Sequence, residues 1–318
     1  MKILKPNFWN YKKVIFVPLY LLLMPFAFIL QIFDHMKSFL SKPHQEKGLK
    51  VICIGNIYLG GTGKTPLSIE LGNLFKNKGK KSVIIKKNYK NQYDEMELVK
   101  SKNINLIVED NRVLAIKKAS KENYEIAILD DGFQDYSIQK DLNILCFGSQ
   151  WLGNGFTIPA GPLRQNLNAI KKSKIIVLNS VNEKIIHKIE NKIKKIKNDI
   201  MIFHSYYEPD IKILKEVKEK RVFAFAGIGN PDNFFKLLSR SGLEIYKKIP
   251  FPDHYMYSKK DLDKIILEAK NKKCKIITTE KDYFRCKKYG MKEIDYLPVN
   301  LIIKEKSKFV NEIEKLIK

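Results

Sequence analysis

The feature that most constrains the fold of this chain is a glycine-rich loop between an apolar strand and a helix. Residues 51–55 are apolar, the loop at residues 56–63 contains three glycines, and Lys64 and Thr65 open a stretch that favours a helix. Such a loop directs backbone N–H groups and the helix N-terminus at a polyphosphate. Lysine and threonine at these positions reach the terminal phosphates and a Mg²⁺ ion, respectively. The order of strand, glycine loop and helix therefore predicts a nucleotide-binding site.

The loop departs from the common pattern G-x-x-x-x-G-K-[ST] at one position. Tyr58 stands where that pattern has its first glycine. The remaining glycines still permit close approach of the backbone to a ligand. A chance turn is the alternative, and the flanking strand and helix argue against it. We expect the nucleotide to contact Tyr58, Leu59, Gly60, Gly61, Thr62, Gly63, Lys64 and Thr65.

A second candidate site lies at the end of another apolar strand. Residues 125–131 read EIAILDD, so two carboxylates follow that strand. Folds of this kind hold there the acidic residue that completes the Mg²⁺ shell. Because adjacent side chains on a strand point to opposite faces, we expect Asp130 to serve the metal with Thr65, while Asp131 orients another group. A solvated strand end is the alternative that would apply without the phosphate loop.

Short apolar runs alternate with helical patterns from residue 50 onward. This alternation predicts a parallel sheet covered by helices, an α/β fold of the P-loop NTPase type, followed by a second, smaller α/β domain. The strands expected in the first domain are residues 51–55, 82–85, 104–108, 126–130, 142–147 and 175–178, and those in the second are residues 222–226, 275–279 and 297–303. Helices are expected at residues 183–197 and 307–318.

The N-terminal segment is the most apolar part of the chain. Residues 14–33 contain no charged side chain in 20 positions, which as a helix span about 30 Å, the thickness of a hydrocarbon core. A signal peptide would have a shorter apolar region and a small-residue cleavage site. We expect a membrane helix, with a helix lying in one leaflet as the second interpretation and a buried core helix as the third. The expected division is residues 1–36 as membrane segment, 37–205 as P-loop domain and 206–318 as smaller domain, with the last helix packing on either half.

The charge balance is strongly basic. Lys and Arg number 59 against 34 Asp and Glu, a net charge of +25, which favours an anionic partner such as phosphorylated substrate or lipid headgroups. Basic residues are spread along the whole chain and are not interleaved with aromatic residues in a compact run, so we expect no nucleic-acid partner. The four cysteines lie far apart without metal-site spacing, which favours a reducing compartment.

Guanine-specific signatures are absent from the sequence. A GTPase would carry N-K-x-D and a D-x-x-G after the metal strand, and this chain has neither. The classes of nucleotide-binding protein that remain are ATP-driven motors or transporters and small-substrate kinases.

A series of motifs resembles one kinase family. The segments are IGNIYLGGTGKTP at 54–66, ILDDGFQ at 128–134, DLNIL at 141–145, IPAGPLR at 158–164, AFAGIGNP at 224–231, FPDHY at 251–255 and TTEKD at 278–282. In this order they are similar to those of tetraacyldisaccharide 4'-kinase, the lipid A 4'-kinase. The same family has a phosphate loop without the first glycine, so Tyr58 fits it.

The resemblance implies an activity and its setting. The γ-phosphate of ATP, with Mg²⁺ as cofactor, would be transferred to the 4'-hydroxyl of a tetraacyl glucosamine disaccharide 1-phosphate in lipid A biosynthesis. The partners would be that lipid precursor and the lipid surface, on the cytoplasmic face of the inner membrane, with no obligate protein partner. A membrane-anchored P-loop adaptor or ATPase without a lipid acceptor is the alternative, and a basic nucleic-acid binder is the third option.

The resemblance also assigns roles to residues outside the phosphate loop. Asp131 is expected to pair with His254 of FPDHY, joining the two domains. Asp94 is expected to be the general base, or to orient the attacking hydroxyl. Lys64 joins these three as a catalytic residue, and Asn56 and Arg164 are expected to contact substrate.

Three departures from the family pattern stand near these residues. The Arg-Gly-Tyr expected after the second strand reads Lys86, Lys87, Asn88, Tyr89. Asp135 replaces a histidine after DDGFQ, and Gln165 replaces the usual glutamate after Arg164.

Overall fold

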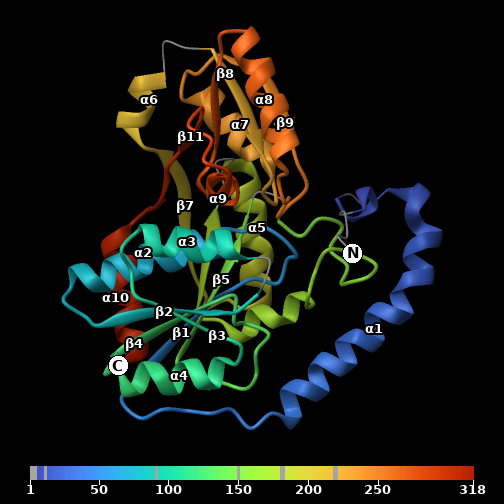
Figure 1. Cartoon of the computed structure of the whole chain (residues 1–318). Helices are drawn as coiled ribbons and strands as arrows, with labels where there is room; N and C mark the ends of the chain where they lie inside the picture. The colour runs from blue at the N-terminus through green and yellow to red at the C-terminus, as the bar shows by residue number, and fades with distance from the viewer. Residues whose placement is uncertain (1–5, 11–12, 90–91, 149–150, 180–182, 218–220) are drawn as a thin grey trace. The chain divides into compact units, whose positions relative to one another are not determined.

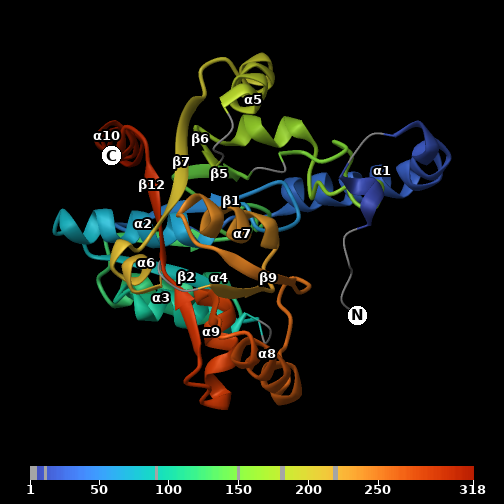
Figure 2. The same cartoon turned by 90° about the horizontal axis from the view of Figure 1, so that it is seen from above.

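The computed structural model describes residues 6–10, 13–89, 92–148, 151–179, 183–217 and 221–318. The chain forms two compact units, which can be followed by colour in Figures 1 and 2. Unit 1 comprises Met1–Lys87, Ile104–Tyr206 and Ile302–Lys318, and unit 2 comprises Asn88–Asn103 and Tyr207–Leu301. The helical insertion Asn88–Asn103 belongs to unit 2, although the expected division placed it in the P-loop domain. The C-terminal helix belongs to unit 1, which is one of the two packings that the sequence left open.

The strands of unit 1 belong to an eight-stranded sheet. Its order is β12-β7-β6-β5-β1-β4-β2-β3, and all neighbours from β3 to β7 are parallel. The strands are β1 (Lys50–Gly55), β2 (Ser82–Lys87), β3 (Leu106–Glu109), β4 (Ile126–Asp130), β5 (Leu142–Phe147), β6 (Ile175–Asn179), β7 (Met201–Pro209) and β12 (Val299–Ile303). Parallel pairing brings the carboxyl ends of β1 and β4 to the same edge, where ligands of such sheets bind.

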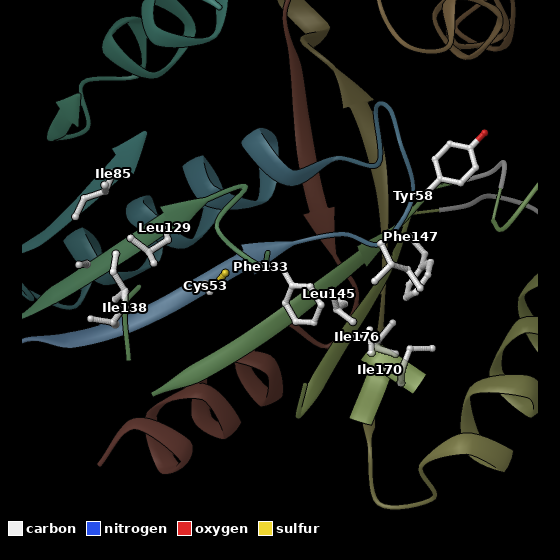
Figure 3. Close-up of a cluster of buried hydrophobic side chains, with 14 of the residues drawn as sticks. Cys53, Tyr58, Ile85, Leu129, Phe133, Ile138, Leu145, Phe147, Ile170 and Ile176 are labelled. Atoms are coloured by element: carbon white, nitrogen blue, oxygen red, sulfur yellow. The ribbon is translucent and has the colours of Figure 1, made fainter. Parts of the chain in front are cut away.

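Helices pack on this sheet through apolar side chains. They are α2 (Lys64–Asn77), α4 (Arg112–Lys121), α5 (Glu183–Ile196) and α10 (Lys306–Ile317), with a 3₁₀ segment η3 (Leu167–Lys172). Figure 3 shows part of the buried cluster, with Cys53, Leu129 and Leu145 on the neighbouring strands β1, β4 and β5. Side chains of α4 and α5 complete this cluster, so one face of the sheet is closed by these helices.

Unit 2 contains a smaller parallel sheet. Its strands are β8 (Val222–Ala226), β9 (Ile245–Pro250), β10 (Lys275–Thr279) and β11 (Ile294–Leu297), in the order β11-β10-β8-β9. Its helices are α3 (Tyr93–Ser101), α6 (Ile211–Val217), α7 (Pro231–Arg240), α8 (Lys259–Asn271) and α9 (Glu280–Cys286), with the 3₁₀ turn η4 (Lys287–Tyr289). Alternate residues of β8 belong to two different apolar clusters, so both faces of the sheet are covered.

The N-terminal segment forms two 3₁₀ turns, η1 (Asn7–Trp9) and η2 (Val14–Phe16), and the long helix α1 (Val17–Leu40). Pro18 lies in the first turn of α1, where a missing N–H costs nothing, and Pro25 lies inside the helix. Of the most apolar window within residues 14–40, 11% is buried, so the interpretation as a core helix is wrong. Figure 1 shows α1 as the long blue helix at the side of the sheet.

The parallel α/β fold of the P-loop type is confirmed, and most expected strands and helices agree within a few residues. The expected strand at 297–303 is wrong, because it is two strands, β11 and β12, separated by Pro298 and belonging to different sheets. Proline has no N–H for a ladder, which explains the break. Strands β7 and β9 were not expected, because residues 245–250 contain two lysines and residues 201–209 mix polar and aromatic side chains.

Candidate active site

The phosphate loop connects β1 to α2 and is braced by its own side chains. Gly63 precedes α2 with φ 95°, and Gly60 has φ 135°, both in a region that favours glycine. The Asn56 amide donates to the Gly60 carbonyl at 3.2 Å and to Thr62 Oγ1 at 3.0 Å. Within residues 56–77 no side chain caps the start of α2, which leaves its first N–H groups without a side-chain partner there and suited to an anion.

Thr65 and Asp130 meet at the carboxyl edge of the sheet. Thr65 Oγ1 donates to Asp130 Oδ2 at 2.8 Å, and Lys86 Nζ contacts the same oxygen at 2.5 Å. Asp130 is 2% exposed, and its other oxygen, Oδ1, has no hydrogen-bond partner among the described residues. A buried, unpartnered carboxylate oxygen is unfavourable unless a cation or donor satisfies it.

Asp131 turns away from Asp130 into a cluster of cations. Its backbone has φ 57°, and its N–H donates to the Ile54 carbonyl at 2.9 Å, which fixes the turn beside β1. Arg164 donates to both Asp131 oxygens, at 2.9 and 3.3 Å, and Lys64 Nζ lies 3.8 Å from Oδ1. Burial alone would raise the pKa of Asp131, but Lys64 and Arg164 outweigh it and lower that pKa.

The segment that carries Arg164 is paired with the phosphate loop. Leu59 N–H donates to the Pro162 carbonyl at 2.8 Å, and Arg164 N–H donates to the Ile57 carbonyl at 2.7 Å. Tyr58 forms an antiparallel bridge with Leu163 and is 2% exposed, and burial raises its pKa to about 12. The residue that replaces glycine is therefore part of this backbone pairing, with its side chain buried.

Buried side chains hold the turn after β4. Arg112 Nη2 donates to the carbonyls of Asp130 and Asp131, at 3.2 and 2.9 Å, and Arg112 Nη1 to Asp135 Oδ2 at 3.1 Å. Asp135, in place of the family's histidine, thus braces Arg112. Gln134 Nε2 donates to the Asn56 carbonyl at 2.8 Å, so the same turn is tied to the phosphate loop.

In unit 2, Asp94 lies in the first turn of α3 and is almost completely buried. Arg285 Nε donates to Asp94 Oδ2 at 3.0 Å, and Arg285 Nη1 to Asp282 Oδ1 at 2.8 Å. Burial would lower the pKa of Arg285, but Asp282 and Asp94 raise it overall. The result is a buried cluster of two carboxylates around one guanidinium.

His254 lies beside this cluster. Its Nδ1 is 3.9 Å from Asp94 Oδ2 and has no hydrogen-bond partner among the described residues. Its side chain is 31% exposed and its backbone has φ 55°, an unusual conformation of a kind that often marks functional sites. Within unit 2, the ring is thus accessible while the carboxylate beside it is not.

The structure brings the expected residues together in two groups. Unit 1 gathers Asn56, Lys64, Thr65, Asp130, Asp131 and Arg164 around the phosphate loop, and unit 2 gathers Asp94 and His254. The pairing of Asp131 with His254 would join the two units and stays a prediction.

Several residues of these groups were not assigned from the sequence. They are Lys86, Arg112, Gln134, Asp282 and Arg285. The signal for Lys86 was a lysine following four apolar or small residues of a strand, and that for Arg285 was its position three residues after Asp282 on one helix face. Arg112 and Gln134 have no such local signal, because their partners lie elsewhere in the chain.

A parallel sheet with a glycine loop after β1, a lysine and threonine opening α2, and an acid at the end of β4 defines a P-loop nucleotide-binding protein. The family model of Tetraacyldisaccharide-1-P 4'-kinase matches residues 19–105 and 94–318. The chain belongs to this family.

Two relatives agree with that assignment, and a solved structure shares the fold. The tetraacyldisaccharide 4'-kinase of Pelagibacter ubique (strain HTCC1062) is 42% identical over 318 residues, covering 99% of each chain. That of Rickettsia canadensis (strain McKiel) is 35% identical over 304 residues, covering 90% of this chain and 89% of the relative. The crystal structure of LpxK from Aquifex aeolicus in complex with ATP has a TM-score of 0.71 at 23% identity, covering 94% of this chain and 100% of that one, and is similar in fold.

Proposed function

We propose that this chain transfers the γ-phosphate of ATP to the 4'-hydroxyl of a tetraacyl glucosamine disaccharide 1-phosphate. Family membership supports this reaction. The observation that carries it is the Thr65–Asp130 contact of 2.8 Å beside the phosphate loop, with Asp130 Oδ1 buried and unpartnered among the described residues.

The same pair fits Mg²⁺. Hydroxyl and carboxylate oxygens are the ligands that Mg²⁺ prefers, together with water and substrate phosphates. Thr65 Oγ1 and Asp130 would hold the ion, which when bound would supply neutralisation of phosphate charge. Lys86 contacts Asp130 Oδ2 and leaves Oδ1 for the metal.

The cations of unit 1 have a binding role. Lys64 and Arg164 share Asp131, and all three are partly exposed, so the two cations are accessible to a phosphate. We assign Lys64 to the terminal phosphates, and Asp131 to holding Lys64 and Arg164 in place before ATP arrives. Fixed cations of this kind stabilise charge that develops during phosphoryl transfer.

In unit 2, we assign the partly exposed ring of His254 to accept a proton, with Asp94 acting through it. The acceptor hydroxyl oxygen forms a bond to the γ-phosphorus, the bond to the bridging oxygen breaks, ADP leaves, and the hydroxyl proton passes to the imidazole. Because Asp94 is 2% exposed and is held by Arg285, its carboxylate serves to orient the ring and to stabilise its charged form. The Asp131–His254 pair is the competing arrangement.

The described residues include one helix, within residues 14–40, that is long and apolar enough to cross a membrane by length and composition. We propose that α1 lies in the surface of the inner membrane, on the cytoplasmic side where ATP is available. Buried Tyr20 and Ala27 and hydrogen-bonded Gln31 and Asp34 occupy one face of α1, and the other faces are exposed and apolar. Basic residues near the surface add about 1 kcal/mol each of attraction to anionic headgroups.

One assay tests the reaction. The protein is incubated with ATP and a tetraacyl disaccharide 1-phosphate in mixed micelles, and mass spectrometry follows the acceptor. One added phosphate, absent with Lys64→Ala, is the expected result. ATP binding without acceptor-dependent turnover would instead indicate the adaptor.

A further inference from the structure

Helix α1 carries a polar stripe that the membrane role does not explain. Gln31, Asp34 and Ser38 are spaced three and four residues apart, so they share a face with the buried Ala27. A carboxylate in so apolar a helix is unfavourable at a lipid surface unless it is hydrogen-bonded. These side chains all contact other segments of unit 1.

Gln31 uses both ends of its amide on one short segment. Its Nε2 donates to the Arg164 carbonyl at 3.2 Å, and its Oε1 accepts the Asn166 N–H at 3.1 Å. The side chain thereby fixes the backbone on both sides of Gln165. Only a group with one donor and one acceptor at this reach can make both bonds.

Asp34 binds the residue between these two. Its Oδ2 accepts from Gln165 Nε2 at 2.7 Å and from the Tyr136 hydroxyl at 2.9 Å. Gln165 also lies 3.3 Å from Gln134, through Oε1 and Nε2. The family's usual glutamate here would set a carboxylate against Asp34, whereas glutamine donates to it, which accounts for this departure.

The segment that α1 holds is the one that shapes the active site. Pro162 and Arg164 pair with the backbone of the phosphate loop, and the Arg164 guanidinium holds Asp131 beside Lys64. A continuous chain of hydrogen bonds thus runs from Gln31 through the Arg164 backbone to the phosphate loop.

We propose that Gln31 and Asp34 are positioning residues for catalysis, and that docking of α1 sets the geometry of Arg164 and the phosphate loop. The helix is then more than an anchor, because the enzyme reaches full activity only with α1 docked. This inference rests on the proposed kinase function and on the assigned role of Arg164.

Two exchanged substitutions test it. Gln31→Leu removes both bonds and adds apolar surface, whereas Leu30→Gln makes the reverse change on a neighbouring side chain that is 48% exposed. We measure kcat, KM for ATP and Tm with acceptor in detergent micelles, and binding to phosphatidylglycerol vesicles. Gln31→Leu should lower kcat on the order of 10-fold in micelles and should bind vesicles as the wild type does. Leu30→Gln should keep the wild-type kcat and bind vesicles more weakly.

Two more variants separate positioning from folding. Gln31→Glu has the same size and keeps the acceptor, but it replaces the donor with a charged oxygen, so it should lose kcat like Gln31→Leu with little change in Tm. Gln165→Glu should also lose activity, and adding Asp34→Asn should restore it by exchanging donor and acceptor. In an Arg164→Ala background, Gln31→Leu should cost little further kcat.

The outcomes are distinct for the two ideas. If the wild type phosphorylates the acceptor and Gln31→Leu and Gln31→Glu both stay within twofold of it in micelles, the positioning role is overturned. If kcat falls only in proportion to lost folded protein, the contacts are structural and the proposal is likewise overturned. If the wild type itself does not phosphorylate the acceptor, the proposed function fails first.

Discussion

Two carboxylate–arginine pairs, one in each unit, combine the same side-chain chemistry in different surroundings. In the Asp131–Arg164 pair, the Asp131 side chain is 27% exposed and lies near two cations at the phosphate loop, Lys64 and Arg164. In the Asp94–Arg285 pair, the Asp94 side chain is 1% exposed, and Arg285 also binds Asp282. The same two kinds of side chain thus form a partly exposed pair in one unit and a buried pair in the other.

The difference teaches which carboxylate can touch a substrate. Partly exposed cations can exchange Asp131 for phosphate at modest cost, because solvent screens an open pair. The Asp94 pair has no such freedom, since breaking a buried pair leaves a charge without compensation. We therefore expect Asp94 to act through His254, whose ring is partly exposed.

The largest effect is expected at the open site. Lys64→Ala and Thr65→Ala should lower kcat on the order of 10³-fold, through lost phosphate neutralisation and lost Mg²⁺ ligation. Arginine at position 64 should not restore activity, because its planar fork does not replace a compact ammonium. Steady-state kinetics measure this, and near-normal turnover in either alanine variant would move the phosphate site elsewhere.

Stability should separate the two arginines. Arg285→Ala leaves Asp94 and Asp282 buried without their cation and should cost about 3–5 kcal/mol of unfolding free energy. Arg164→Ala opens an accessible pair and should cost less than about 1 kcal/mol, though it lowers activity. Urea denaturation gives both values, and equal losses would mean that the contrast in burial has no energetic consequence.

Two double-mutant cycles decide which carboxylate works with His254. Asp94→Asn, Asp131→Asn and His254→Ala should each lower kcat on the order of 10²-fold. If Asp94 orients the ring, Asp94→Asn with His254→Ala should lose little more than His254→Ala alone, while Asp131→Asn with His254→Ala should be nearly additive. The reverse pattern would support the Asp131–His254 pair and refute our assignment.

The smallest expected effect is a change in thermal stability at acid pH. Because the folded pKa of Asp131 is lowered, its ion pairs add stability above its unfolded pKa of about 4, and this contribution is lost as the pH falls through the folded value. Asp131→Asn should therefore show a smaller drop in Tm between pH 6 and pH 3 than the wild type. The exposed Asp263→Asn is the matched control, and an unchanged drop for Asp131→Asn would contradict the lowered pKa.

Much of unit 1 was predictable from local pattern. Residues 51–75 show the hydrophobic pattern and glycine content typical of a strand, a phosphate loop and a helix. The acids at 130 and 131 come directly after an apolar strand in the sequence. The P-loop site and its metal pair were expected for that reason. In unit 2, the motifs located Asp94 and His254, and their surroundings were not expected.

The sequence by itself determined which residues are chemically equipped to bind a nucleotide, because those residues lie within one loop and two strand ends. Only the tertiary structure decided how exposed each one is and what holds it. Asp94 meets Arg285 across 191 positions of sequence, and Gln31 meets Arg164 across 133. Such contacts leave no local pattern in the sequence, because they form only when packing brings distant segments together. Low exposure to solvent then strengthens each of these hydrogen bonds.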